Sequence, residues 1–188
     1  MQAKNTKLRL MTEGALMIAL ATLLSFYPKL MDLPYGGSVT LEMIPLVVMS
    51  YRHGVKWGTF TAFVHSVLQL ILGFSNVMYC TTLLRQFGCI MLDYIVAFSI
   101  IGTACWFAGL FKNRVIGSGF GAFVVCCIRF VCHFITGIWL WGGYAPEGMS
   151  AAYYSLVYNG SYMLFDTIIT VAAAVLLVKY APKLFEKA

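Results

Sequence analysis

Three very apolar segments of this chain carry side chains of the kinds that bind ligands: a carboxylate, an imidazole, an amide and several aromatic rings. In chain order these are Asp93 and Tyr94, then His133 and Trp141, then Tyr154 and Asn159. Polar groups are costly in lipid, so a set of them inside apolar segments marks a binding or transport site by default. The sequence therefore predicts a ligand site built from three segments.

The chemistry of these side chains suits a flat, cationic, heteroaromatic ligand. An ionised carboxylate in lipid needs a cation or several donors, and a cationic ligand would serve Asp93 in this way. His133 could hydrogen-bond or stack on such a ring, and Trp141 could attract the charge to its face. The structural alternatives are a helix-to-helix acceptor for Asp93, a packing histidine, and an interfacial tryptophan. Trp139 points about 200° away from Trp141 on an ideal helix, so we expect only Trp141 to face the site.

Further tyrosines belong to the same hypothesis. Tyr154 and Tyr158 share a helix face, to which Asn159 is adjacent, and Tyr35 and Tyr79 are weaker candidates. A belt of interfacial aromatic residues would explain the tyrosines equally well. The primary amide of Asn159 is harder to explain in that way, because it needs hydrogen-bond partners inside a membrane span.

Two further charged residues lie deep in the last two segments. Arg129 and Asp166 would each be costly if unpaired, so the sequence predicts that they form a structural ion pair with each other. The alternative is that Arg129 pairs with Asp93, which would weaken the ligand hypothesis.

The composition identifies an integral membrane protein. Of the 188 residues, 61% are hydrophobic and only 11% are charged, whereas soluble domains carry roughly a quarter charged residues. The basic residues flank apolar segments instead of forming a face that could bind nucleic acid. The six cysteines show neither metal-ligand spacing nor a disulfide framework. We expect no cofactor and no metal site.

The chain divides into six apolar segments, at about 10–27, 41–51, 57–73, 83–110, 115–140 and 152–180. They predict an all-α protein, a single domain over residues 1–188, with six transmembrane helices. Both termini and the basic turns at 52–56 and 112–114 then lie on one side, with most of the 13 Lys and Arg residues. The positive-inside rule places both termini in the cytoplasm.

This orientation brings the candidate residues to a similar depth. Asp93 lies about ten residues below the outer end of its segment, or roughly 15 Å. His133 and Asn159 each lie about seven residues below the outer ends of theirs. The predicted site is therefore in the outer half of the membrane and opens outward.

Several short motifs, in their order and spacing, resemble the thiamine-specific substrate-binding component of energy-coupling factor transporters. They are Gly36-Gly37-Ser38 through Glu42 to Pro45, Arg52-His53-Gly54 with Lys56-Trp57-Gly58, Leu92-Asp93-Tyr94, Arg129-Phe130 with His133, and Tyr154-Ser155 with Tyr158-Asn159-Gly160. The resemblance covers most of the chain.

The resemblance implies a substrate-binding subunit of the bacterial plasma membrane, with six spans and no catalysis of its own. It implies thiamine as the ligand, with Asp93, Tyr94, His133, Trp141, Tyr154 and Asn159 lining the site and the first loop closing over it. It also implies that a membrane coupling subunit, contacted by Ala15 and Ala19, and two cytosolic ATPases drive uptake. Small residues at that spacing let helices approach closely, although they could equally serve packing within the protein.

The chain departs from the family pattern at two site positions. The acidic residue is Asp instead of the Glu found in some members, and the first loop has no clear tryptophan. The alternatives are a related ligand, such as another vitamin or a thiamine-precursor pyrimidine, a small membrane enzyme that uses Asp93 and His133 as an acid–base pair, and a stand-alone channel. The lack of a nucleophile motif or a second nearby carboxylate argues against the enzyme.

Overall fold

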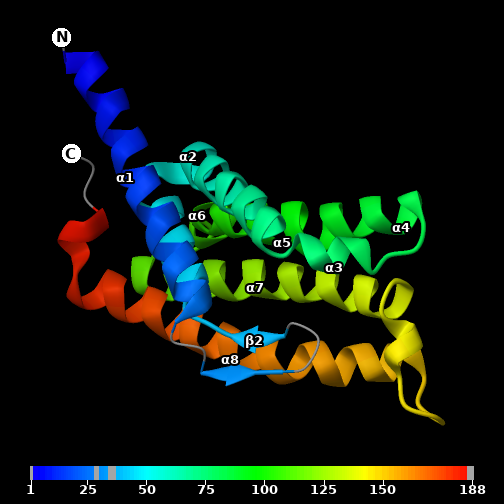
Figure 1. Ribbon diagram of the computed structural model, residues 1–188. Coiled ribbons are helices and arrows are strands. Elements are labelled where there is room, and N and C mark those ends of the chain that lie inside the picture. The colour runs from blue at the N-terminus through cyan, green and yellow to red at the C-terminus, as the bar shows by residue number, and fades with distance from the viewer. Residues whose placement is uncertain (1, 28–29, 34–36, 186–188) are drawn as a thin grey trace.

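The computed structural model describes residues 2–27, 30–33 and 37–185, and these are almost entirely helical (Figure 1). The long helices are α1 (Gln2–Phe26), α2 (Met43–Leu72), α7 (Arg114–Trp139) and α8 (Ala151–Tyr180). The stretch 83–108 is a continuous run of α4 (Leu83–Gly88), the π-helical turns η2 (Cys89–Val96), α5 (Ala97–Ser99), the 3₁₀ turn η3 (Ile100–Thr103) and α6 (Ala104–Ala108). The short elements are β1 (Met31–Asp32), β2 (Ser38–Val39), α3 (Phe74–Met78), η4 (Gly142–Tyr144) and η5 (Pro182–Phe185).

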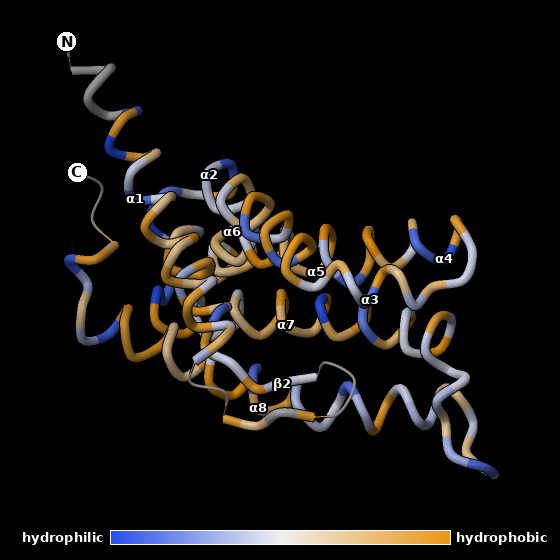
Figure 2. Tube along the Cα trace, in the orientation of Figure 1, coloured by the Kyte–Doolittle hydropathy of each residue, from blue (hydrophilic) through white to orange (hydrophobic). Residues whose placement is uncertain are grey.

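Five helical stretches of the described chain are long and apolar enough to cross a membrane. They are Lys7–Phe26, Met43–Leu72, Leu83–Ala108, Arg114–Trp139 and Ala151–Tyr180. Figure 2 shows hydrophobic residues along most of each long helix. The prediction of an all-α membrane protein is confirmed.

The stretch counted as one helix, α2, is a hairpin of two helical arms. Gly54 interrupts it with φ 84° and ψ 176°, a conformation that essentially only glycine adopts. Glu42 and Gln69 are 27 residues apart, yet their side chains are hydrogen-bonded at 2.6 Å. A straight helix would separate them by about 40 Å. The two arms correspond to the segments predicted at 41–51 and 57–73, and the count of six membrane crossings stays a prediction.

The turn of the α2 hairpin lies at the same end of the protein as both chain termini (Figure 1). Glu13 of α1 pairs with Arg52 at 2.7 Å and with His53 at 2.6 Å. Arg52 also donates to the carbonyl of Leu184 near the C-terminus, and Tyr51 donates to the carbonyl of Ser118 near the start of α7. The predicted grouping of the termini and the basic turns at one end is therefore found.

Close helix contacts hold the middle of the bundle together. α7 and α8 lie side by side along most of their length (Figure 1). The second arm of α2 meets η3 backbone to backbone, because a Cβ on Gly58 would lie 2.6 Å from the carbonyl oxygen of Gly102. These contacts leave a hollow at the other end of the bundle, which the β1–β2 ribbon covers along α8.

Candidate ligand-binding site

A cavity of about 640 Å³ lies between α2, η2, α7 and α8 and reaches the β1–β2 ribbon. Its lining includes every predicted ligand residue that the structure describes: Tyr79, Asp93, Tyr94, His133, Trp141, Tyr154, Tyr158 and Asn159. Tyr35 lies outside the described residues. Three segments far apart in the sequence thus do bring their polar groups to one place.

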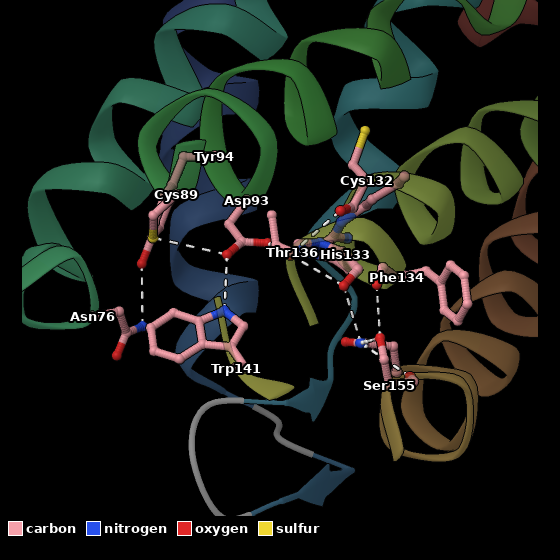
Figure 3. A network of polar contacts seen from close by, with 12 residues as sticks. Asn76, Cys89, Asp93, Tyr94, Cys132, His133, Phe134, Thr136, Trp141 and Ser155 are labelled. Atoms are coloured by element: carbon pink, nitrogen blue, oxygen red, sulfur yellow. Dashed lines mark hydrogen bonds and ion pairs between the residues drawn. The ribbon is translucent and has the colours of Figure 1, made fainter. Parts of the chain in front are cut away.

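Asp93 is at the centre of a polar network (Figure 3). Its Oδ1 accepts from His133 Nδ1 at 3.0 Å and from the hydroxyl of Thr136. Its Oδ2 accepts from the indole nitrogen of Trp141 at 3.2 Å and lies 3.8 Å from the thiol of Cys89. The carboxylate is therefore held by two residues of α7, His133 and Thr136, and by Trp141 just beyond the end of that helix.

The backbone around Asp93 is unusual, because η2 is wound as a π-helix over Cys89–Val96. Such wide turns are rare and frequently occur at functional sites. α7, which supplies His133 and Thr136, is a regular helix that begins at an Asn113 cap and ends at Trp139, two residues before Trp141. His133 and Thr136 are three residues apart on it, so they share one face.

Trp139, the last residue of α7, and Trp141, two residues further on, have different surroundings. Trp141 lines the cavity and packs against the buried cluster around Val77 and Cys89. Trp139 lies outside the cavity lining, with its ring against Gly88, where a side chain would collide with it. The expectation that only Trp141 faces the site is met.

Tyr94 and Asn159 line the cavity while holding neighbouring backbone in place. The hydroxyl of Tyr94 donates to the carbonyl of Gly73 at 2.9 Å and accepts from Asn76 at 3.1 Å. The amide of Asn159 donates to the carbonyls of His133 and Ser155, each at 3.1 Å. Its oxygen accepts from the hydroxyl of Tyr162 at 3.0 Å. The amide thus has the partners that its position in an apolar segment requires.

The ribbon of β1 and β2 closes one side of the cavity against α8. The amide of Gly37 donates to the hydroxyl of Tyr158 at 3.1 Å. A Cβ on Gly37 would come within 2.8 Å of the Tyr162 ring, so only glycine fits there. The amide of Thr40 donates to Asp166 Oδ1 at 3.0 Å. The ribbon, whose tip lies outside the described residues, is therefore held to α8 at both of these points.

The predicted ion pair between Arg129 and Asp166 is wrong. Arg129 instead pairs with Glu42 at 3.1 Å, and its guanidinium carbon lies 4.4 Å above the Phe98 ring. Glu42 becomes available because the α2 hairpin carries it into the bundle, where Gln69 also donates to it. Asp166 binds the Thr40 backbone instead. The alternative pair of Arg129 with Asp93 is not formed either.

Sequence reasoning left several residues of this cavity unassigned, among them the polar residues Glu42, Gln69 and Thr136. Glu42 was given no role in the predicted ligand site, because the sequence alone does not show that the α2 hairpin buries it. Its spacing from Pro45 is nevertheless part of the first motif quoted above. Thr136, three residues after His133, could have been found from helix periodicity.

The formal charges of the described lining residues do not cancel. Two carboxylates, Glu42 and Asp93, face one guanidinium, Arg129. Since Glu42 and Arg129 neutralise each other, one negative charge remains on Asp93, with Trp141 directly against it. A cavity with this charge and this aromatic lining favours a cation with an aromatic ring.

A second surface of interest is the outer face of α1. Ala15 and Ala19 are exposed, whereas Gly14 and Ala21 on the same helix are buried against the bundle. The predicted small-residue pair therefore does not pack within the described chain.

Comparisons with known proteins agree on one family. A family model described as thiamine transporter protein matches residues 11–186. The thiamine transporter ThiT of Bacillus subtilis is 33% identical over 184 aligned positions, which cover 93% of this chain and 92% of that protein. ThiT of Lacticaseibacillus paracasei is 29% identical over 197 positions, covering 97% and 92%. The solved structure of ThiT from Listeria monocytogenes superposes with a TM-score of 0.77 at 27% identity, covering 95% of this chain and 98% of that one.

Proposed function

This chain belongs to the thiamine transporter protein family, and from that premise we propose that its cavity captures thiamine from outside the cell. It is a multi-pass protein of the bacterial plasma membrane with a transport role, not an enzyme. The acid–base interpretation of Asp93 and His133 is accordingly set aside. The proposal concerns the ligand, the residues that meet it and the way in which uptake is driven.

The observation that carries the proposal is the unbalanced negative charge of Asp93 beside the indole of Trp141. Thiamine carries a permanent positive charge on its thiazolium ring, which is flat and aromatic. The negative charge of the carboxylate stabilises this cation inside the cavity, and the indole attracts it to its face. A neutral pyrimidine precursor lacks the cation, so it would gain nothing from either group.

The aminopyrimidine half of thiamine is assigned to the remaining aromatic wall. Tyr154 and Tyr158 have ring centroids 5.7 Å apart on α8 and offer a surface on which a second flat ring can stack. His133, Asn159, Tyr94 and Tyr79 complete the proposed lining. The ribbon of β1 and β2 is the proposed cover of the occupied site, because it is already held to α8 through Gly37.

Uptake requires energy that this chain does not supply, since its sequence has no phosphate-binding loop of the Walker A type. We propose that it is the substrate-binding component of an energy-coupling factor transporter. In this arrangement a membrane coupling subunit contacts Ala15 and Ala19 of α1, and two cytosolic ATPases drive transport. The exposed small residues support the proposal because they allow a partner helix to approach closely.

Ligand binding to the purified protein tests the proposal directly. Adding thiamine should quench tryptophan fluorescence at micromolar concentrations, because the ligand stacks on Trp141. Trp141→Phe should abolish the quench, whereas Trp139→Phe, outside the cavity lining, should retain it. Calorimetry on the same samples should show the pyrimidine precursor binding at least about tenfold more weakly than thiamine. Absence of both quench and heat at micromolar thiamine would refute the proposed ligand.

A further inference from the structure

The carboxylate of Asp93 already has a protein donor near each of its acceptor positions, the weakest being the Cys89 thiol at 3.8 Å. Two carboxylate oxygens offer about four lone-pair sites. His133 and Thr136 donate to Oδ1, and Trp141 and the weaker thiol donor Cys89 approach Oδ2. Figure 3 shows the carboxylate between these groups, with Trp141 on one side and Thr136 and His133 on another. The side chain retains only 14% of its exposure. A ligand could bond to it only by displacing a protein donor.

The same contacts determine which nitrogen of His133 carries hydrogen. A carboxylate oxygen only accepts, so the hydrogen of this bond lies on Nδ1. The other nitrogen, Nε2, is buried and has no hydrogen-bond partner in the described chain. A buried N–H without an acceptor is costlier than an unused lone pair. The neutral ring with hydrogen on Nδ1 therefore fits this environment better than the imidazolium ion.

A neutral His133 matters for the charge of the site. If the ring were protonated, its positive charge would cancel the negative charge of Asp93. Glu42 and Arg129 already cancel each other, so the lining would then carry no net charge. With the ring neutral, the negative charge of Asp93 persists. This charge acts on a ligand that lies against the rings of Trp141 and His133.

Thr136 adds the donor that completes this arrangement. Its hydroxyl could also bond within its own helix, to the carbonyls of Cys132 at 3.3 Å and His133 at 3.1 Å. The Asp93 carboxylate is the stronger acceptor because it is charged, and one hydroxyl hydrogen serves one strong acceptor. Aspartate is a short side chain, and the Thr136 hydroxyl holds it towards α7.

We propose that Asp93 and Thr136 are positioning residues. Thr136 holds the Asp93 carboxylate, and the carboxylate fixes the ring of Trp141 and the Nδ1–H tautomer of His133. Asp93 acts on the ligand's charge through these two rings without touching the ligand. This inference rests on the proposed function for the identity of the ligand. Its consequences for Thr136 and for the tautomer concern the protein alone.

The tautomer can be measured without any ligand. The chain has three histidines, so protein labelled with ¹⁵N at histidine gives few signals, and His133→Gln assigns the relevant pair. We expect a neutral ring with Nδ1 protonated in the ligand-free protein, lost or mixed in Asp93→Asn. An imidazolium, or a ring with hydrogen on Nε2, overturns the inference whether or not thiamine binds.

The role of Thr136 is tested by its substitution. Thr136→Val removes the donor and should weaken thiamine binding by roughly tenfold, while Thr136→Ser should recover most of the affinity. Thr167→Val is the matched control, because Thr167 bonds within its helix to the Met163 carbonyl at 2.6 Å and lies outside the lining. Equal affinities for the Val and Ser variants overturn the role of Thr136.

Direct contact is distinguished by the indole signal. If Asp93 acts through Trp141, the N–H of that ring stays bonded to the carboxylate when thiamine binds, so its hydrogen exchange stays slow. Fast exchange in the complex means that the ligand has displaced the indole, which overturns the positioning role. Failure of wild-type protein to bind thiamine would refute the proposed function and leave the tautomer result standing.

Discussion

At the scale of single residues, three acids inside the described bundle are stabilised in three different ways. Glu42 is paired with a guanidinium, Asp166 accepts from a backbone amide, and Asp93 is held by uncharged donors from α7 and from Trp141 just beyond it. Burying a charge without any such partner costs several kcal/mol. Of the two acids without an ion-pair partner, Asp93 lines the cavity and Asp166 does not, so the charge of Asp93 is the one that can act on a ligand.

The Glu42–Arg129 pair offers a prediction on stability. Glu42→Gln should lower the free energy of unfolding by about 3 kcal/mol, because it leaves the Arg129 guanidinium buried at 7% exposure without a counter-ion. Adding Arg129→Met should recover part of the loss, since it removes the unpaired charge. Thermal unfolding in detergent measures both. A double variant less stable than the single one would show that Arg129 has another partner of equal weight.

At the scale of elements, the hairpin in α2 does most to assemble the cavity. Its turn places Glu42 beside the second arm, and its two arms pack between α1 and the stretch 83–108. The turn depends on Gly54, whose backbone conformation excludes side chains. The cavity is thus built by a backbone feature far from the ligand.

Gly54→Ala is therefore expected to destabilise the protein by roughly 1–3 kcal/mol. The open space around Gly54 means that the cost would arise from the backbone and not from a collision. Gly160→Ala is a suitable control, because Gly160 lies within α8 and also has open space around it. It should be neutral or slightly stabilising. Similar melting temperatures for the two variants would contradict the backbone argument.

The elements also show where sequence patterns stop being informative. Apolar runs locate the arms of α2, α7 and α8, because burial in lipid alone makes a run apolar. The π-helical turns around Asp93 follow no such pattern. The pairing of Arg129 with Glu42 spans 87 residues and depends on the fold of the hairpin. Depth along a helix predicted which residues share the cavity, but it could not predict which donors each acid would choose.

At the scale of the whole molecule, the cavity and the surface proposed for coupling are separate. The cavity lies between α2, η2, α7 and α8, whereas α1 faces outward along most of its length, with Ala15 and Ala19 exposed. α1 touches the cavity only near its outer end, through Ser25 and Phe26. Changes on the outer face of α1 can therefore alter partner contact without altering the ligand site.

This separation predicts the effect of enlarging the α1 surface. Leucine at both Ala15 and Ala19 should leave thiamine affinity within about twofold of wild type, because the side chains extend away from the bundle. It should abolish thiamine uptake in cells that contain the coupling subunit and ATPases, because a partner helix can no longer approach closely. The measurements are calorimetry on purified protein and uptake of labelled thiamine by cells.

Ala172→Leu is the matched control for that experiment, since Ala172 is exposed on α8, away from α1. A lipid-facing leucine at this position should spare both binding and uptake. If uptake survives in the α1 variant, the proposed contact on this face is wrong. If binding falls together with uptake, the two alanines serve the fold of the bundle. A partner contact on α1 would then have to involve other positions of the helix.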